Sequence, residues 1–193
     1  MNKLSEKYLW LGVILLFFIS SCTEFTPKPK GYFRIEFEKP QYKTLQTDSL
    51  PYSFEIEKNT EVQIIESSRN EKWLNLVYPL QNATLYCSYL RVSKADVKNA
   101  IKDSYNLVQK QESILSIQEK SYNNSLNKIH GSLFLIKGDC ISPIQFHLTD
   151  SVNHFFRGSV YYSGKTNSDS IAPVTNYLIQ NITHIMETFN WEN

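Results

Sequence analysis

Residues 143–162 read PIQFHLTDSVNHFFRGSVYY and predict a β-hairpin. The runs 143–149 and 154–162 are rich in aromatic and β-branched side chains, which favour strands. Between them, the loop 150–153 contains Asp and Ser, whose side chains can bind the backbone amides of a turn. The two strands therefore lie antiparallel, and the sheet to which they belong is expected to be mostly antiparallel.

Further runs of strand type stand on both sides of one expected helix. They cover residues 32–37, 52–56, 62–65, 73–78, 85–92, 114–119 and 129–136. The segment Ser93–Asp96 resembles a capping box that opens the helix, and an apolar stripe continues to about Gln111. The polar stretch between Pro40 and Pro51 reads as a loop.

A second helix is predicted to follow Asp169-Ser170, with Pro173 in its first turn, where proline is tolerated. An order of strands, helix, strands and helix indicates an α+β fold rather than alternating parallel units. We expect a single, mostly antiparallel sheet flanked by helices. Because no repeat or long linker divides residues 32–193, they are expected to form one α+β domain.

The composition indicates a folded protein without a nucleic-acid partner. The chain has 193 residues, of which 41% are hydrophobic and 13% aromatic, more than disordered chains carry. Lys and Arg total 20 against 19 Asp and Glu, and no long basic run occurs. Nucleic-acid binding therefore has no electrostatic support.

The N-terminal residues predict secretion and lipidation. Lys3 and Lys7 precede an apolar run over residues 9–19, which is shorter than the roughly 20 residues of a spanning helix. The sequence ISSC that follows, at positions 19–22, resembles a bacterial lipobox. An ordinary signal peptide with an incidental cysteine, or a single short membrane anchor, are the alternatives.

On the lipobox interpretation, residues 1–21 form a lipoprotein signal peptide that is removed. Cys22 then carries the acyl chains, such as palmitate, and residues 22–31 form a tether that contains Pro and Lys. Glu24 is the only acidic residue near the anchor, so the segment has no strong acidic surface-export signal. This pattern favours the periplasmic face of the outer membrane.

Two cysteines remain after Cys22, at positions 87 and 140. A location outside the cytoplasm makes a Cys87–Cys140 disulfide chemically possible. Free Cys is also a common small buried residue, so the spacing alone leaves both states open.

The hairpin carries the residues on which a catalytic or metal site would have to be built. If Thr149 lies opposite His154, both His147 and His154 are on one face of the ribbon. A metal site there lacks a third ligand, because Asp150 is in the turn. A hydrolase built on Ser151 lacks the glycine elbow and an oriented base. We expect no catalytic residue, cofactor or metal ligand.

Several large polar and aromatic residues are instead candidates for contact with a partner. The candidates are Arg34, Trp73, Tyr89, His154 and Arg157. Trp, Tyr and Arg are the types that dominate interface hot spots. They can equally pack in the core or form internal ion pairs.

Segments across the whole chain carry a resemblance to a known family. These parts are Cys22, PKPKGYFRI (27–35), PYSF (51–54), WLN (73–75), SY (88–89), PIQF (143–146), LTDS (148–151), HFFRG (154–158), DSIAPV (169–174) and Trp191. Together they resemble the gliding-motility lipoprotein GldD family of Bacteroidota. Cys87 and Cys140 depart from the family pattern, so a bridge between them could not be a family-wide requirement. The element order also resembles the Mog1/PsbP-type α/β/α sandwich, by analogy only.

The family resemblance implies an envelope lipoprotein needed for gliding and for the associated type IX secretion, without catalytic activity. Our leading hypothesis is a non-catalytic docking or stabilising component that binds the membrane through its lipid and binds proteins of this machinery. The alternative is a periplasmic ligand-binding or hydrolytic domain centred on the hairpin Gln145–Arg157. A compact pocket that holds His147, His154 and a third polar group would favour this alternative, whereas a convex hairpin would not.

Overall fold

The structure is a computed structural model that describes residues 37, 39–66, 71–164 and 171–192. The described residues belong to one compact unit, which spans positions 34–193. Its main sheet has seven strands in the spatial order β3-β4-β5-β9-β8-β7-β6, and all neighbours are antiparallel. The strands are β3 (Glu61–Glu66), β4 (Glu71–Tyr78), β5 (Ala83–Arg91), β6 (Ile114–Asn124), β7 (Ile129–Gly138), β8 (Ile144–Thr149) and β9 (His154–Tyr162).

Two meanders make up this sheet. The strands β3, β4 and β5 form one, and β6 to β9 form the other; β5 and β9 pair to join them. The short 3-10 helix η1 (Pro79–Gln81) connects β4 to β5, and Asn82 after it has a positive φ of 48°. Asn is one of the few residue types that adopt this left-handed conformation readily.

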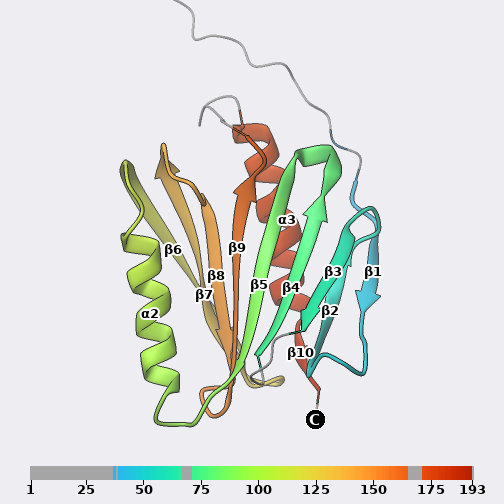
Figure 1. Cartoon of the computed structure of the whole chain (residues 1–193), viewed down its shortest axis with the longest axis vertical. Coiled ribbons are helices and arrows are strands. Elements are labelled where there is room, and N and C mark those ends of the chain that lie inside the picture. Colours follow the sequence, from blue (N-terminus) through green and yellow to red (C-terminus); the bar gives the residue numbers. More distant parts are fainter. Residues whose placement is uncertain (1–36, 38, 67–70, 165–170, 193) are drawn as a thin grey trace, which may run out of the picture. The chain divides into compact units, whose positions relative to one another are not determined.

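One helix packs on each face of the main sheet, which gives an α/β/α arrangement (Figure 1). Helix α2 (Val97–Gln109) places Val108 against Phe134 and Ile136. Helix α3 (Ala172–Thr188) places Leu178 and Ile182 in the main core on the other side. We call these two sides of the sheet the α2 face and the α3 face. The predicted α+β class is confirmed.

A second, three-stranded sheet lies on the α3 side, whereas the sequence predicted a single sheet. Its order is β1 (Tyr42–Leu45), β2 (Tyr52–Glu57) and β10 (Asn190–Trp191), and both pairs are antiparallel. β1 lies in the stretch that reads as a loop from the sequence. Strands of four and two residues contain too few positions for an alternating pattern to be recognised.

The main core contains a cluster of aromatic rings from distant segments of the chain. Tyr52 of β2 lies 4.8 Å from Phe156 of β9 and 5.5 Å from Phe189, measured between ring centroids. Gly158 lies beside this cluster, and a Cβ atom there would come within 2.3 Å of the Phe146 ring. A glycine is therefore required for β9 to approach the Phe146 side chain.

Both predicted helices are present. Ser93 Oγ accepts a hydrogen bond from the Asp96 backbone N–H at 3.3 Å in the turn before α2. The helix starts at Val97, and its N-cap is Asp96, which makes no side-chain capping hydrogen bond, so the predicted capping box does not form at the helix start. Pro173 lies in the first turn of α3, as predicted. No helix within the described ranges is long and apolar enough to cross a membrane.

The strand expected at residues 32–37 lies outside the described residues except for Phe37, which is not in a strand. The Phe37 ring stacks on the Tyr177 ring of α3 with a centroid distance of 4.4 Å. The predicted signal peptide, the predicted lipidation at Cys22 and the predicted tether also lie outside the described part of the chain.

The register of the β8–β9 hairpin differs by one residue from the expected one. Thr149 pairs with Phe155, and His147 pairs with Arg157. The loop causes this shift, because Asp150 Oδ1 accepts a hydrogen bond from the His154 N–H at 2.8 Å. A shift of one residue moves a side chain to the other face. His147 is therefore on the α2 face and His154 on the α3 face, which corrects the expectation that they share one.

Candidate functional site

The α2 face of the main sheet is covered on one side only. Helix α2 contacts β8 and β9 and buries the side chains of Phe134 and Ile136 on β7. No described helix lies over β3, β4 and β5 on this face (Figure 1). Four large side chains from these strands and from β9 are exposed there: Ile65 (42%), Trp73 (46%), Tyr86 (49%) and Tyr161 (38%). We call these four residues, together with Arg157, the open half of the α2 face.

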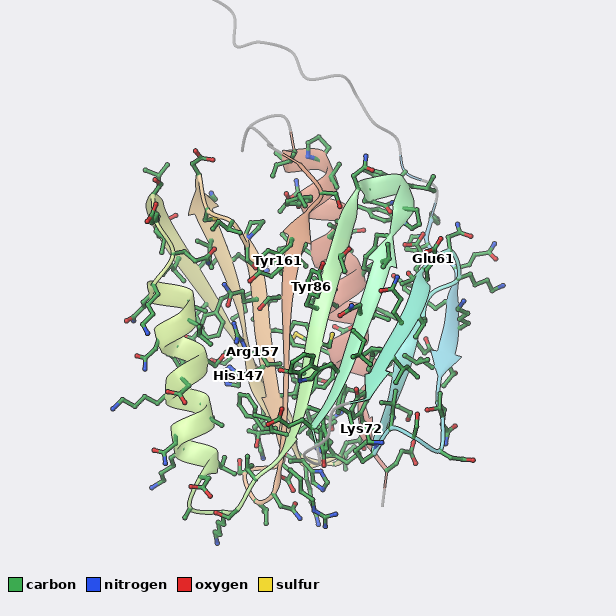
Figure 2. The ribbon with its side chains drawn as sticks, in the orientation of Figure 1. Glu61, Lys72, Tyr86, His147, Arg157 and Tyr161 are labelled. Carbon is green, nitrogen blue, oxygen red and sulfur yellow. The ribbon has the colours of Figure 1, made fainter. Side chains whose placement is uncertain are left out.

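The strand register brings two of the predicted interaction candidates together in this half. Trp73 on β4 pairs with Ser88 on β5, and Ser88 pairs with Arg157 on β9. One strand separates Trp73 from Arg157, so their backbones are about 10 Å apart. Figure 2 shows Tyr86 and Tyr161 close together above Arg157, and their rings meet edge to face at 5.5 Å.

These residues surround a hollow of about 210 Å³ in the surface. It is lined by Trp73, Asn75, Tyr86, Cys87, Ser88, Arg157, Ser159 and Tyr161. We call it the Arg157 hollow. Only one of these lining residues, Arg157, carries a charge at neutral pH, and three of them provide aromatic rings.

The Arg157 guanidinium has neutral partners only. Its Nη2 donates hydrogen bonds to Gln145 Oε1 at 3.1 Å and to Ser159 Oγ at 3.3 Å. Its Nε is buried and has no hydrogen-bond partner. Within the described ranges no carboxylate lies at ion-pair distance from it. Burial lowers the pKa of Arg157 from its usual value, but an arginine side chain keeps its charge in proteins.

The other two interaction candidates in the described residues form a separate pair on the α3 face. The Tyr89 hydroxyl and His154 Nδ1 are hydrogen-bonded at 2.8 Å, and the Trp191 ring stacks on the His154 ring at 4.9 Å. Burial lowers the pKa of His154, although Asp150 opposes this shift. A neutral His154 ring can accept or donate one hydrogen bond to the tyrosine.

This pair lines a cleft of about 850 Å³ at the end of the sheet. The cleft is bordered by Gln46, Thr47, Asp48, Ser49, Leu50, Pro51, Lys72, Tyr89, Arg91, Asn153, His154 and Glu192. Cations and anions are mixed in its lining, which includes Lys72 and Arg91 as well as Asp48 and Glu192. The cleft therefore has no single charge preference that would select one class of ligand.

Asp150 and Ser151 have structural roles in the hairpin turn. Asp150 Oδ1 accepts hydrogen bonds from the backbone N–H groups of Val152, Asn153 and His154 at 2.8–2.9 Å. Burial raises the pKa of the Asp150 carboxyl, but these three hydrogen bonds lower it, and the net shift is downward. Ser151 has a positive φ of 64° and is bound through its N–H to Thr149 Oγ1.

His147 is a core residue of the covered half. Its Nδ1 is 3.3 Å from Ser104 Oγ of α2, and its ring stacks on Phe155 at 5.8 Å. Burial lowers the pKa of His147 to about 4, so the ring is neutral at pH 7. Because His147 and His154 are on opposite faces of the sheet, their side chains do not come together in one site within the described residues. Among the described residues, no three His, Cys, Asp or Glu side chains are grouped as metal ligands would be.

The structure does not contain the disulfide that the sequence leaves open. Cys87 and Cys140 are both free thiols. Cys87 is buried in the main core on the α3 face, whereas Cys140 packs against the cluster of Val108, Phe134 and Ile136 on the α2 face. Cys87 is in the middle of β5, whereas Cys140 is in the loop between β7 and β8, and the strands β9 and β8 lie between β5 and β7 in the sheet. Arg34, the fifth interaction candidate, lies outside the described residues.

Sequence reasoning missed Tyr86, Tyr161 and Ile65 as members of a surface. Alternation within β4 and β5 shows which residues share a face of each strand. The pairing of Ile65 with Trp73 and of Asn75 with Tyr86 then places Ile65 and Tyr86 next to Trp73, and the pairing of Tyr86 with Ser159 places Tyr161 next to Tyr86. That pairing depends on contacts between distant strands.

The lipobox predicted from the sequence and the α+β domain of the structure together fit a bacterial envelope lipoprotein. The family model of the gliding motility lipoprotein GldD matches residues 22–191, and the chain belongs to this family. The protein is accordingly a gliding motility lipoprotein, lipid-anchored in the cell envelope. The sequence-based assignment to the GldD family is confirmed.

Comparisons with solved structures and with curated proteins give no further information on function. The chain is similar to the solution structure of cyanobacterial PsbP (CyanoP) from Synechocystis sp. PCC 6803, with a TM-score of 0.49 and 5% sequence identity. The alignment covers 80% of this chain and 94% of that chain. No curated protein matches the chain.

Proposed function

We propose that the protein is a non-catalytic docking or stabilising component of the gliding apparatus and its associated type IX secretion machinery. Lipid at Cys22 would hold it at the periplasmic face of the outer membrane, and the open half of the α2 face would contact a protein of the machinery. The observation that carries this proposal is the set of exposed aromatic side chains on a sheet face that α2 leaves uncovered.

The composition of this half fits an interface better than a plain solvated surface. Large aromatic side chains and arginine carry most of the binding energy in protein interfaces. Contiguous exposed apolar patches are rare on monomeric proteins and mark interaction sites. Trp73, Tyr86 and Tyr161 are neighbours in the register rather than scattered single residues.

A lipid anchor makes modest affinity sufficient. Confinement beside a membrane raises the effective concentration of the domain near membrane-bound partners, in the way that a linker does between two binding modules. Acyl chains contribute about 0.8 kcal/mol for each buried methylene group, so the anchor itself needs no spanning segment.

The docking surface can be tested in cells that produce the full-length protein. We expect Trp73→Ala combined with Tyr86→Ala to reduce gliding speed and secretion while the protein stays folded and lipidated. The matched control is Leu115→Ala with Leu126→Ala, because these apolar side chains are 84% and 95% exposed elsewhere on the molecule. Normal gliding and secretion in the Trp73 and Tyr86 variant would exclude this surface as the docking site.

The anchor is tested by Cys22→Ser. This variant is expected to fold normally, since residue 22 precedes the domain, but to leave the membrane fraction and to lose gliding and secretion. Mass spectrometry of the wild-type N-terminus should show the acyl chains on Cys22. Full gliding and secretion with a soluble Cys22→Ser protein would show that tethering is not required.

A further inference from the structure

The Arg157 hollow contains a cation that lacks an anion. Arg157 is the one charged residue of its lining, and its buried Nε has no hydrogen-bond partner. The neighbouring acceptors, Gln145 Oε1 and Ser159 Oγ, are neutral and both bind the same nitrogen, Nη2. The described residues therefore do not satisfy all the hydrogen-bond donors of the guanidinium that lines the hollow.

This arrangement is unfavourable for the protein alone. A partly buried charge loses part of its hydration, and only a charged or well-bonded partner restores the lost free energy. Gln145 Oε1 and Ser159 Oγ are neutral acceptors, and a neutral N–H donor at position 157 would be enough to satisfy them. A planar guanidinium is suited to a carboxylate, with which it forms two parallel charge-assisted hydrogen bonds.

The size and charge of the hollow limit which chemical groups can occupy it. About 210 Å³ is small for a cofactor or drug-sized ligand, whose sites span roughly 300–1,000 Å³. One cation matches one negative charge, whereas a phosphate group carries up to two. The rings of Trp73, Tyr86 and Tyr161 offer apolar surface around the charge, so the groups beside the anion should be apolar or aromatic.

We propose that the Arg157 hollow receives an Asp or Glu side chain of a protein partner, from a segment whose neighbouring apolar or aromatic residues pack on Trp73, Tyr86 and Tyr161. This inference rests on the proposed docking function and names the chemistry of the partner at that same surface. Arg157 supplies charge selection, and the three rings supply contact area.

The experiment uses the full-length lipidated protein in its native envelope. Gln63 is exposed on β3 and pairs with Asn75, which places it beside the hollow without lining it. Replacing Gln63 by the photoreactive residue p-benzoylphenylalanine should give a crosslinked band with a protein. Mass spectrometry of this band should identify a partner segment that contains Asp or Glu.

The charge dependence is read from the intensity of that band. We expect Arg157→Lys to retain most of the crosslink and Arg157→Met to reduce it by about tenfold or more, because a hydrogen bond to a charged group is lost. Changing the partner's acidic residue to Lys should cause the same loss with wild-type Arg157. The same change should restore the band with Arg157→Glu.

A stability measurement separates a binding role from a structural one. Arg157→Met removes a partly buried charge that has no anion, so we expect the melting temperature of the solubilised protein not to fall. Arg91→Met is the matched control, because Arg91 is an exposed cation of the cleft on the α3 face. This control should keep both the crosslink and the melting temperature.

Other outcomes would overturn the inference. An equally strong band with Arg157→Met, or a partner segment without an acidic residue, would reject the carboxylate while leaving the docking function in place. Muramidase cleaves the glycan strands of peptidoglycan. A crosslinked band that disappears after muramidase digestion would show that the occupant of the hollow is this glycan, and it would reject a protein carboxylate. No band with wild-type Arg157 would reject the docking surface itself, and the inference with it.

Discussion

The two halves of the α2 face belong to the same sheet and follow the same alternation, but they lie on different strands and differ in what covers them. In the covered half, α2 buries Phe134, Ile136 and a neutral His147. In the open half, Trp73 and Tyr86 remain exposed, and Arg157 has no anionic partner in the described chain. The covered half thus has the features of a stabilising core, and the open half has those of a contact surface.

The register makes this comparison direct, because single rows of paired residues cross both halves. One row contains Trp73, Ser88, Arg157, His147 and Ser132, in that order from β4 to β7. The next row contains Asn75, Tyr86, Ser159, Gln145 and Phe134. Residues of one row can therefore be replaced in matched pairs, one in the covered half and one in the open half. A difference in stability between the two variants can then be attributed to packing against α2 rather than to the position in the sheet.

The largest expected difference is between Phe134→Ala and Tyr86→Ala. Phe134 is 1% exposed, and its loss leaves a cavity that should cost about 3–5 kcal/mol of unfolding free energy. Tyr86 is 49% exposed, so its loss should cost less than about 1 kcal/mol. Chemical denaturation of the purified variants measures both values. Equal losses would mean that the two halves do not differ in their contribution to stability.

A pH titration should show the contribution of His147. Its pKa is lowered to about 4 by burial, whereas the unfolded chain titrates near 6.5. Because the unfolded state binds the proton first, stability is complete above about pH 6.5 and falls by roughly 3 kcal/mol as the pH approaches 4. Thermal unfolding at several pH values measures this fall.

The matched variants for this titration are His147→Gln and His154→Gln. His147→Gln should flatten the fall in stability between pH 6.5 and 4, since its side chain does not titrate. His154 is only half-buried and lies on the other face, so His154→Gln should leave most of the pH dependence. An unchanged profile in His147→Gln would contradict the assignment of a buried neutral ring.

The two cysteines provide a smaller contrast between the core and its edge. Cys87→Ser places a hydroxyl in the buried core without a partner and should cost about 1–3 kcal/mol. Cys140 is half-buried and its thiol is near the Ile136 carbonyl, so Cys140→Ser should cost under about 0.5 kcal/mol. A disulfide would instead make both variants similarly unstable and make the wild type sensitive to reductant.

The smallest expected effect comes from two serines in one row. Ser132 Oγ donates to Glu119 Oε1 at 2.6 Å beneath α2, and this hydrogen bond lowers the pKa of Glu119. Ser132→Ala should therefore cost about 1 kcal/mol. Ser88 has no side-chain hydrogen bond within the described residues, and Ser88→Ala should change stability by less than about 0.5 kcal/mol. Denaturation curves of the two variants and of the wild type measure both changes in the free energy of unfolding.

Most elements of the fold could be predicted, because their patterns are local. The strands β4, β5 and β7, and both helices, follow from alternation, helical periodicity and the position of Pro173. β1 and β10 could not be predicted, since strands of four and two residues depend on pairing with β2 rather than on their own sequence.

The candidate site was predicted only in part. Trp73 and Arg157 have residue types that indicate contact surfaces, and the structure brings them to the same hollow. Tyr89 and His154 instead meet on the opposite face. The error in the hairpin register arose because Asp150 binds the backbone of His154, an interaction that the count of loop residues does not reveal.

The sequence by itself determined the lipoprotein class, the family and the α+β order of elements, because these depend on motifs and local periodicity. Tertiary structure alone decided which half of the α2 face is covered, where Arg157 lies relative to Trp73, and that His147 is buried. The physical reason is that alternation fixes which residues share a side of one strand. Pairing between distant strands and the packing of α2 determine which of those sides meets water.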